Sequence, residues 1–128
     1  MNIHQINSQQ FVLSNLAKAD VNISAENKSL SFNALTMFVA SLGRCTYVIL
    51  AHYAMRLDKP VRNIRIDMHW QQSGHKPAHI NQIDMTIYWP ELPKSRIKAI
   101  QRATRFCTVH NTISNCVKIN TTVSTDQN

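Results

Sequence analysis

The sequence predicts a single α+β domain that covers residues 1–128. One observation is a long and almost continuous apolar run over residues 35–57, which is typical of a buried helix. The other is a set of short segments in which apolar and polar residues alternate, which is typical of strands with one buried face. A chain of 128 residues is also long enough to bury a core without disulfide bonds.

The N-terminal part contains two short strand-like segments, residues 11–13 and residues 21–23. We expect residues 15–20 to connect them as a hairpin.

The apolar run over residues 35–57 is predicted to form a long central helix, capped by Ser31 or Asn33. A membrane span is the alternative. Polar residues interrupt the run, however, and a charge such as that of Arg44 near the middle of a bilayer costs about 3 kcal/mol or more. We therefore expect a helix buried on nearly every face in a protein core, and no association with a membrane.

Two segments with period-two alternation follow, residues 64–70 and residues 83–89. The stretch between them is rich in turn-forming residues and predicts an antiparallel hairpin with a long loop. Pro93 suits the first position of a helix, on which Ile97, Ile100, Thr104 and Cys107 would share the inward face.

A short helical turn through Ile113 is expected to end at Asn115 in the left-handed conformation. Residues 117–123 alternate again and predict a closing strand.

The chain is basic, with 14 Lys and Arg against 7 Asp and Glu and a formal net charge of +7. Such a surplus favours an acidic partner. The densest cluster has helical spacing, which indicates one solvated helix face rather than a nucleic-acid interface, so we expect no nucleic-acid partner. It comprises Lys94, Arg96, Lys98, Arg102 and Arg105.

Residues 1–10 are polar and lack the basic stretch and apolar run of a secretory signal, so we expect a cytoplasmic protein. Thiols are normally reduced in that compartment. The cysteines at positions 45, 107 and 116 are therefore expected to be buried, catalytic or metal-bound rather than structural disulfides.

Cysteine is the only candidate nucleophile with a plausible setting, because the sequence has no Gly-rich phosphate loop, paired-carboxylate motif or standard metal motif. Cys45 follows Gly43 closely, and a glycine inside a helix suggests a kink or a close approach. If the helix restarted there, its free N–H groups would favour the thiolate of Cys45.

Two alternatives remain open at this point. Cys45 and Cys107 could both be inert core residues. With His110 and Cys116 they could also form a Cys3His zinc site, although only Cys107 and His110 have a familiar ligand spacing.

Two stretches of the sequence resemble the two cysteine motifs of the OsmC and organic hydroperoxide resistance (Ohr) family. The first is ALTMFVASLGRCT around Cys45, and the second is RATRFCTVHNTISNCVKI around Cys107. The intervening strands and helix follow the same order, so the resemblance covers about residues 30–123.

The resemblance implies an OsmC-like fold, with antiparallel sheets around a long central helix, in an intertwined homodimer whose active sites lie at the interface. It implies a thiol-dependent peroxidase that reduces organic hydroperoxides, with Cys45 attacking and Cys107 resolving. A dithiol reductant of unknown identity would regenerate the thiols, and no metal or other cofactor is expected.

The sequence departs from the family in two places. In the peroxidase branches a Glu precedes the first cysteine where this chain has Leu35 and Thr36. The family's active-site Arg comes from the N-terminal segment, whereas the first Arg here is Arg44 and the replacement cation would be Lys18. The alternative function is therefore an OsmC-like protein that binds an apolar small molecule and has weak or lost peroxidase activity.

Overall fold

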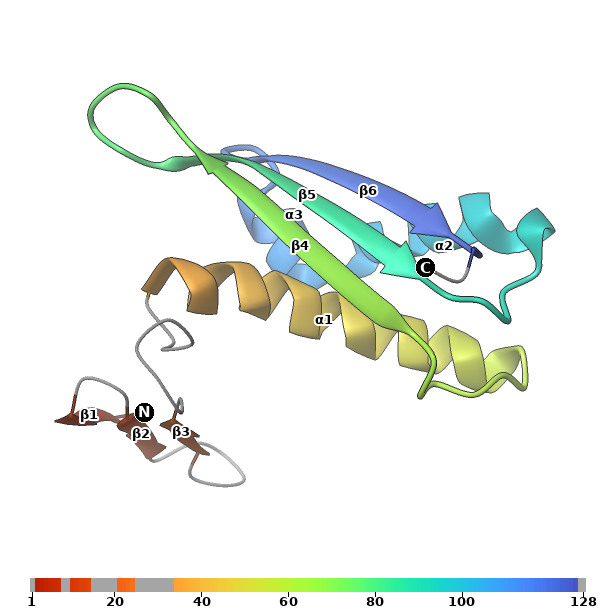
Figure 1. Ribbon diagram of the computed structural model, residues 1–128, viewed down its shortest axis with the longest axis horizontal. Helices are drawn as coiled ribbons and strands as arrows, with labels where there is room; N and C mark the ends of the chain where they lie inside the picture. Colours follow the sequence, from red (N-terminus) through yellow and green to blue (C-terminus); the bar gives the residue numbers. More distant parts are fainter. Residues whose placement is uncertain (1, 8–9, 15–20, 25–33, 127–128) are drawn as a thin grey trace. The chain divides into compact units, whose positions relative to one another are not determined.

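The computed structural model describes residues 2–7, 10–14, 21–24 and 34–126, with side chains from Ala34 to Asp126. The chain forms two compact units, Met1–Phe38 and Val39–Asn128, which are described separately below. Figure 1 shows the order of their elements along the chain. The expectation of one domain over residues 1–128 stays a prediction.

The first unit contains a three-stranded antiparallel sheet of β1 (Asn2–Asn7), β2 (Gln10–Ser14) and β3 (Val21–Ser24) in that spatial order. The two predicted strands are confirmed as β2 and β3. Strand β1 was not predicted, because its sequence lacks a regular alternation of apolar and polar residues. This irregularity matches a shift in the pairing register with β2 between Gln5 and Asn7. The predicted connection at residues 15–20 and the predicted caps Ser31 and Asn33 lie outside the described residues.

Helix α1 (Ala34–Arg56) matches the predicted apolar helix. It runs through Gly43 without interruption, so neither a kink nor a restart of the helix occurs at that residue. A Cβ at Gly43 would lie 3.6 Å from the Sδ atom of Met68, which is an ordinary van der Waals contact, so the close approach that the sequence suggested is not one that requires a glycine.

Burial on α1 is confined to one stripe, so the expectation of burial on nearly every face does not hold for a single chain. Among the described residues, α1 is also the one helix long and apolar enough to cross a membrane, with 22% of its most apolar window buried. Core helices of soluble proteins meet the same criterion, and the absence of a membrane partner stays a prediction. The buried residues are Val39, Leu42, Thr46, Leu50 and Ala54.

The second unit contains a three-stranded sheet in the order β4-β5-β6. Strands β4 (Arg65–Gln72) and β5 (Ile80–Tyr88) form the predicted antiparallel hairpin. Strand β6 (Lys118–Ser124) pairs with β5 in the parallel direction, which corrects the expectation of purely antiparallel sheets. The reason is the helical crossover over residues 89–117, which returns the chain to the beginning of β5.

The crossover contains η2 (Lys94–Arg96), α2 (Ile97–Ala103), η3 (Thr104–Phe106) and α3 (Thr108–Ile113). Pro93 precedes η2 in an extended conformation with ψ 134°, so it is not the first helical residue as predicted. The predicted left-handed conformation of Asn115 is also wrong, because among the described non-glycine residues only Asp58 has a positive φ. Asn115 needs no left-handed conformation to end the helix, because the carbonyl of Ile113 already accepts hydrogen bonds from the N–H groups of Cys116 and Val117.

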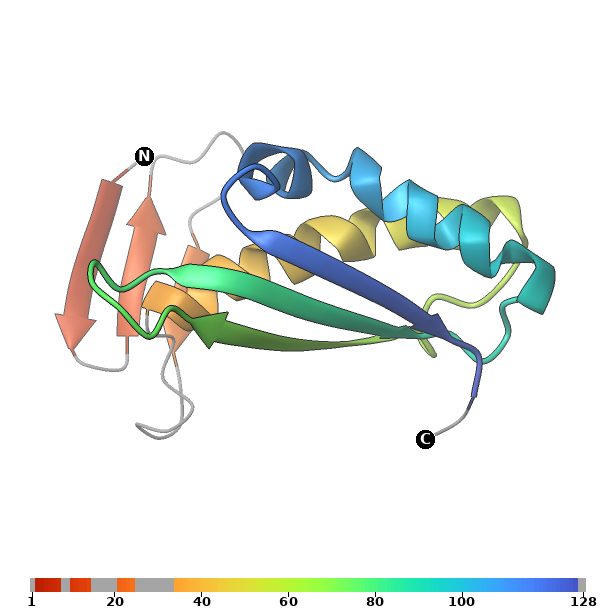
Figure 2. The ribbon, with the colours of Figure 1, turned by 90° about the horizontal axis from the view of Figure 1, so that it is seen from above.

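Helix α1 and the crossover helices lie on the same face of the β4-β5-β6 sheet (Figures 1 and 2). One buried cluster joins Leu50 of α1 to Ile87 of β5 and Ile100 of α2. A second cluster joins Leu42 of α1 to Ile83 of β5 and Cys107 of the crossover. The five clustered cations of the crossover are all exposed, which confirms the predicted solvated face.

Candidate active site: a pair of thiols

The second buried cluster brings Cys45 and Cys107 together. Cys45 lies in the middle of α1 and Cys107 lies between η3 and α3. The Cys107 thiol donates a hydrogen bond to the sulfur of Cys45. Both thiols are free, so the structure shows the reduced form of the pair.

The backbone of Cys107 is extended, with φ −65° and ψ 124°, and this residue is the N-cap of α3. Its Sγ atom accepts a hydrogen bond from the N–H of His110 at 3.4 Å. Its carbonyl accepts a second bond from the N–H of Asn111 at 3.1 Å. Cys107 is fully buried, as predicted, but at a break between two helical segments rather than on the inward face of one helix.

The surroundings of Cys45 favour its thiolate. Burial raises the pKa of the Cys45 thiol, but hydrogen bonds from the Cys107 thiol and from the N–H groups of Val109 and Thr108 together hold that pKa below its ordinary value. The predicted helical N–H groups are therefore present, but they belong to the first turn of α3 rather than to a restarted α1.

The surroundings of Cys107 have the opposite effect. Burial raises the pKa of the Cys107 thiol, and so do its hydrogen bond to Cys45 and the negative charge that Cys45 carries when ionised. The N–H groups of His110 and Val109 offset only part of this rise. The pair therefore consists of one thiol with a lowered pKa and one with a raised pKa.

Other candidate residues lie outside this pair. Cys116 is exposed and free, and within residues 34–126 no three His, Cys, Asp or Glu side chains form a metal-binding group. The structure therefore does not assemble the Cys3His alternative. Arg44 is exposed and points about 100° away from Cys45 around α1. Lys18 lies outside the described residues.

Sequence reasoning missed the amides of Thr108 and Val109 as part of the site. Cysteine is not among the residues that usually cap helices, so no residue pattern indicates that α3 begins directly after Cys107.

The family model of OsmC-like proteins matches residues 25–122, which is more than half of the chain. This chain belongs to the OsmC-like family. No protein of curated function matches the sequence of this OsmC-like protein.

Solved structures share the fold of this OsmC-like protein. An osmotic stress induced and detoxification response protein from Psychrobacter arcticus has a TM-score of 0.77 at 12% identity, over 96% of this chain and 93% of that chain. An organic hydroperoxide resistance protein OsmC from Legionella pneumophila has a TM-score of 0.67 at 13% identity, over 96% and 93%.

The organic hydroperoxide resistance protein OhrB of Bacillus subtilis has a TM-score of 0.59 at 16% identity, over 96% of this chain and 95% of that chain. At these identities the likeness shows the fold, and the α+β OsmC-like fold expected from the two cysteine motifs is confirmed.

Proposed function

We propose that this protein is a thiol-dependent peroxidase that reduces organic hydroperoxides, with Cys45 as the attacking thiol and Cys107 as the resolving thiol. The observation that carries the proposal is the hydrogen bond from Cys107 to Cys45, because it lowers the pKa of one thiol and raises that of the other. A peroxidase of this type needs a thiolate to attack and a second thiol within reach to resolve.

The proposed reaction has two steps. The Cys45 thiolate attacks the peroxide oxygen farther from the organic group, the O–O bond breaks, and the alkoxide leaves and takes up a proton to become an alcohol. Cys45 is then a sulfenic acid. Cys107 attacks that sulfur, releasing water and forming a Cys45–Cys107 disulfide. A dithiol reductant restores both thiols by disulfide exchange.

The surroundings of the pair support an organic substrate over hydrogen peroxide. Apolar side chains pack, together with Cys45, against the buried cluster that contains Cys107, among them Ile49 of α1 and Val109 and Ile113 of α3. The names of the similar structures from Legionella pneumophila and Bacillus subtilis point in the same direction. The proposal needs no metal or other cofactor, and it fits a cytoplasmic setting in which thiols are kept reduced.

One observation favours the second candidate, an OsmC-like protein that binds apolar small molecules. No charged side chain contributes to the lowered pKa of Cys45 within the described part of the chain. Leu35 and Thr36 stand where the peroxidase branches have Glu, and neither can orient a guanidinium. Without a fixed cation to hold the peroxide, binding could persist while the reaction becomes slow.

The deciding experiment is to treat the reduced protein with one equivalent of cumene hydroperoxide and, separately, one equivalent of hydrogen peroxide. We expect cumyl alcohol to form in a one-to-one ratio and the protein mass to fall by two hydrogens, faster with the organic oxidant. If the hydroperoxide binds but Cys45 stays reduced, the protein is the binding protein of the second candidate.

A further inference from the structure

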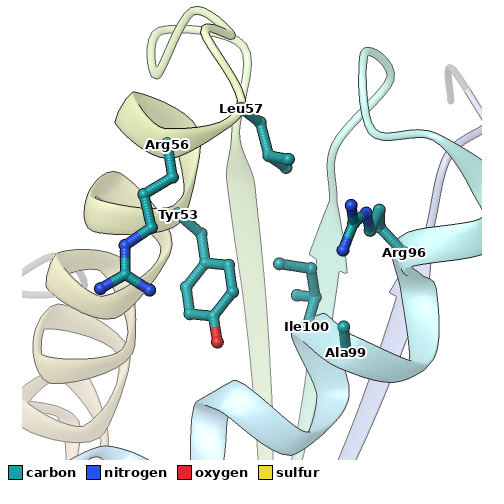
Figure 3. Close-up of a pocket in the computed structure, with 6 residues that line it drawn as sticks. All are labelled: Tyr53, Arg56, Leu57, Arg96, Ala99 and Ile100. Carbon is teal, nitrogen blue, oxygen red and sulfur yellow. The ribbon is translucent and has the colours of Figure 1, made fainter.

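Apart from the thiol pair, the structure contains a cavity between α1 and α2, toward the C-terminal end of α1 (Figure 3). Its volume is about 270 Å³. Tyr53, on its wall, follows Cys45 by eight residues, which corresponds to about 12 Å along the helix. The cavity is therefore separate from the thiol pair. Its lining consists of Tyr53, Arg56, Leu57, Arg96, Ala99 and Ile100.

Most of the wall is apolar. Leu57 and the ring of Tyr53 come from the α1 side, and Ala99 and Ile100 face them from α2 (Figure 3). Ile100 is fully buried in the main core, so this side of the wall is fixed by packing. A dry apolar cavity of roughly 150 Å³ holds benzene. The cavity therefore has room for one aromatic ring and a polar group.

Two guanidinium groups border this apolar wall. The Arg56 guanidinium carbon lies 5.7 Å from the centre of the Tyr53 ring, on the side of that ring away from Ala99 and Ile100 (Figure 3). The Arg96 side chain extends from the end of η2, directly before α2, toward the space between the helices (Figure 3). Among the described side chains, neither Arg56 nor Arg96 forms an ion pair. The ion pair found there joins Arg65 and Asp67.

No carboxylate neutralises the cavity from its own wall. Along the sequence, no acidic residue lies between Glu91 and Asp126, so the helical segments η2, α2, η3 and α3 contain no acidic residue. Two unpaired guanidinium groups beside an apolar wall are complementary to an anion that carries an apolar body.

We propose that this cavity binds a small organic carboxylate with a flat apolar body. The apolar body lies against Leu57 and Ile100, and the carboxylate accepts hydrogen bonds from Arg96, with Arg56 adding positive charge at the rim. The site is independent of the thiol chemistry, so it does not rest on the proposed peroxidase function.

The experiment is calorimetric titration of the full-length reduced protein with benzoate, benzamide and inorganic phosphate. Benzamide keeps the ring without the charge, and phosphate keeps the charge without the ring. We expect saturable binding of one benzoate per chain and binding of the other two that is at least about tenfold weaker, since a hydrogen bond to a charged group is worth about 1.5–3 kcal/mol. Equal binding of phosphate, or no saturable binding of benzoate at millimolar concentration, would overturn the proposal.

Two variants locate the site. Arg96→Gln should weaken benzoate binding about tenfold or more, and Ala99→Leu should block it by filling the cavity. Arg102→Gln is the matched control, because Arg102 is an exposed arginine of α2, the helix that directly follows Arg96, and it does not line the cavity. Circular dichroism checks that each variant is folded. Benzoate binding that survives both cavity variants, or that falls equally in the control, places the ligand elsewhere and refutes the site.

Discussion

The thiol of Cys107 donates a hydrogen bond to the sulfur of Cys45, and it thereby lowers the pKa of its partner while raising its own. This contact shifts the pKa values of two chemically identical side chains in opposite directions. It also makes the properties of each cysteine depend on the other, so each can be tested by changing its partner.

The first prediction concerns the product of mild oxidation. One equivalent of cumene hydroperoxide should link Cys45 to Cys107 and leave the exposed Cys116 free, because only the first two thiols are in contact. Non-reducing peptide mapping identifies the linkage. Cys107→Ser should stop the reaction at a sulfenic acid on Cys45, which dimedone traps. A map in which Cys107 pairs with Cys116 would contradict the two-cysteine mechanism.

The second prediction concerns the ionisation of Cys45. In a Cys116→Ser background, alkylation of Cys45 should rise with pH around a midpoint below the free-thiol pKa of about 8.5. Cys107→Ser keeps a hydroxyl donor and should move the midpoint only slightly. Cys107→Ala removes the donor, so the pKa of Cys45 should rise and the midpoint should move to higher pH.

Arg44→Ala is the control for this titration. Arg44 is adjacent in sequence but points away around the helix, so its removal should leave the midpoint unchanged. A shift as large as that of Cys107→Ala would show that a cation, and not the hydrogen bond, stabilises the thiolate.

Sequence patterns predicted most elements of the second unit. Alternation located β4, β5 and β6, although only β5 buries a full row of side chains and β4 leaves Trp70 exposed, and apolar content located α1. The direction of β6 could not be predicted, because it depends on how the crossover returns the chain to β5 and not on the residues of β6. Gly43 suggested a kink or a close approach, but α1 is continuous there and Met68 leaves room for a Cβ, which only the tertiary structure shows.

The site was only partly predictable. The motif resemblance singled out Cys45 and Cys107, whereas their spacing in the chain did not. The amides of Thr108 and Val109 carry no side-chain signal, so their contribution to the pKa of Cys45 emerges only from the tertiary structure.

The third prediction is that the protein is a stable homodimer at micromolar concentration. Helix α1 buries one stripe and leaves other apolar side chains exposed, with Met55 76% and Val48 41% accessible. A second chain is the expected cover. Light scattering should report a dimer, and Met55→Glu or Val48→Glu should shift it toward monomer. Lys98→Glu, on the solvated face of α2, should leave the mass unchanged; a monomeric parent protein would refute the prediction.

The fourth prediction concerns Gly43. A methyl group there would meet Met68 at an ordinary contact distance of 3.6 Å, and alanine favours a helix over glycine by about 1 kcal/mol. Gly43→Ala should therefore raise the free energy of unfolding by about 0.5–1 kcal/mol, measured by urea denaturation. A loss of stability would show that something packs more closely against this position than Met68 does.

The fifth prediction concerns rate. Hydroperoxide reduction should be slower than in family members that have the Arg and Glu, because among the described residues only hydrogen bonds favour the thiolate, and the chain has no Arg before Arg44. Stopped-flow measurement of single-turnover oxidation, side by side with such a family member, gives the comparison. Equal rates would show that the missing pair is not needed.

The unequal exposure of the two sulfurs also sets the order in which the disulfide is reduced. Cys107 is fully buried, whereas Cys45 is partly accessible, so an incoming reductant thiolate meets the Cys45 sulfur first. In the proposed cycle the reductant therefore forms a mixed disulfide with Cys45 and expels Cys107, which takes up a proton, before the second reductant thiol releases Cys45. The Cys45 sulfur thus reacts with the hydroperoxide in the oxidation step and with the reductant in the reduction step. The buried Cys107 sulfur contacts neither the hydroperoxide nor the reductant.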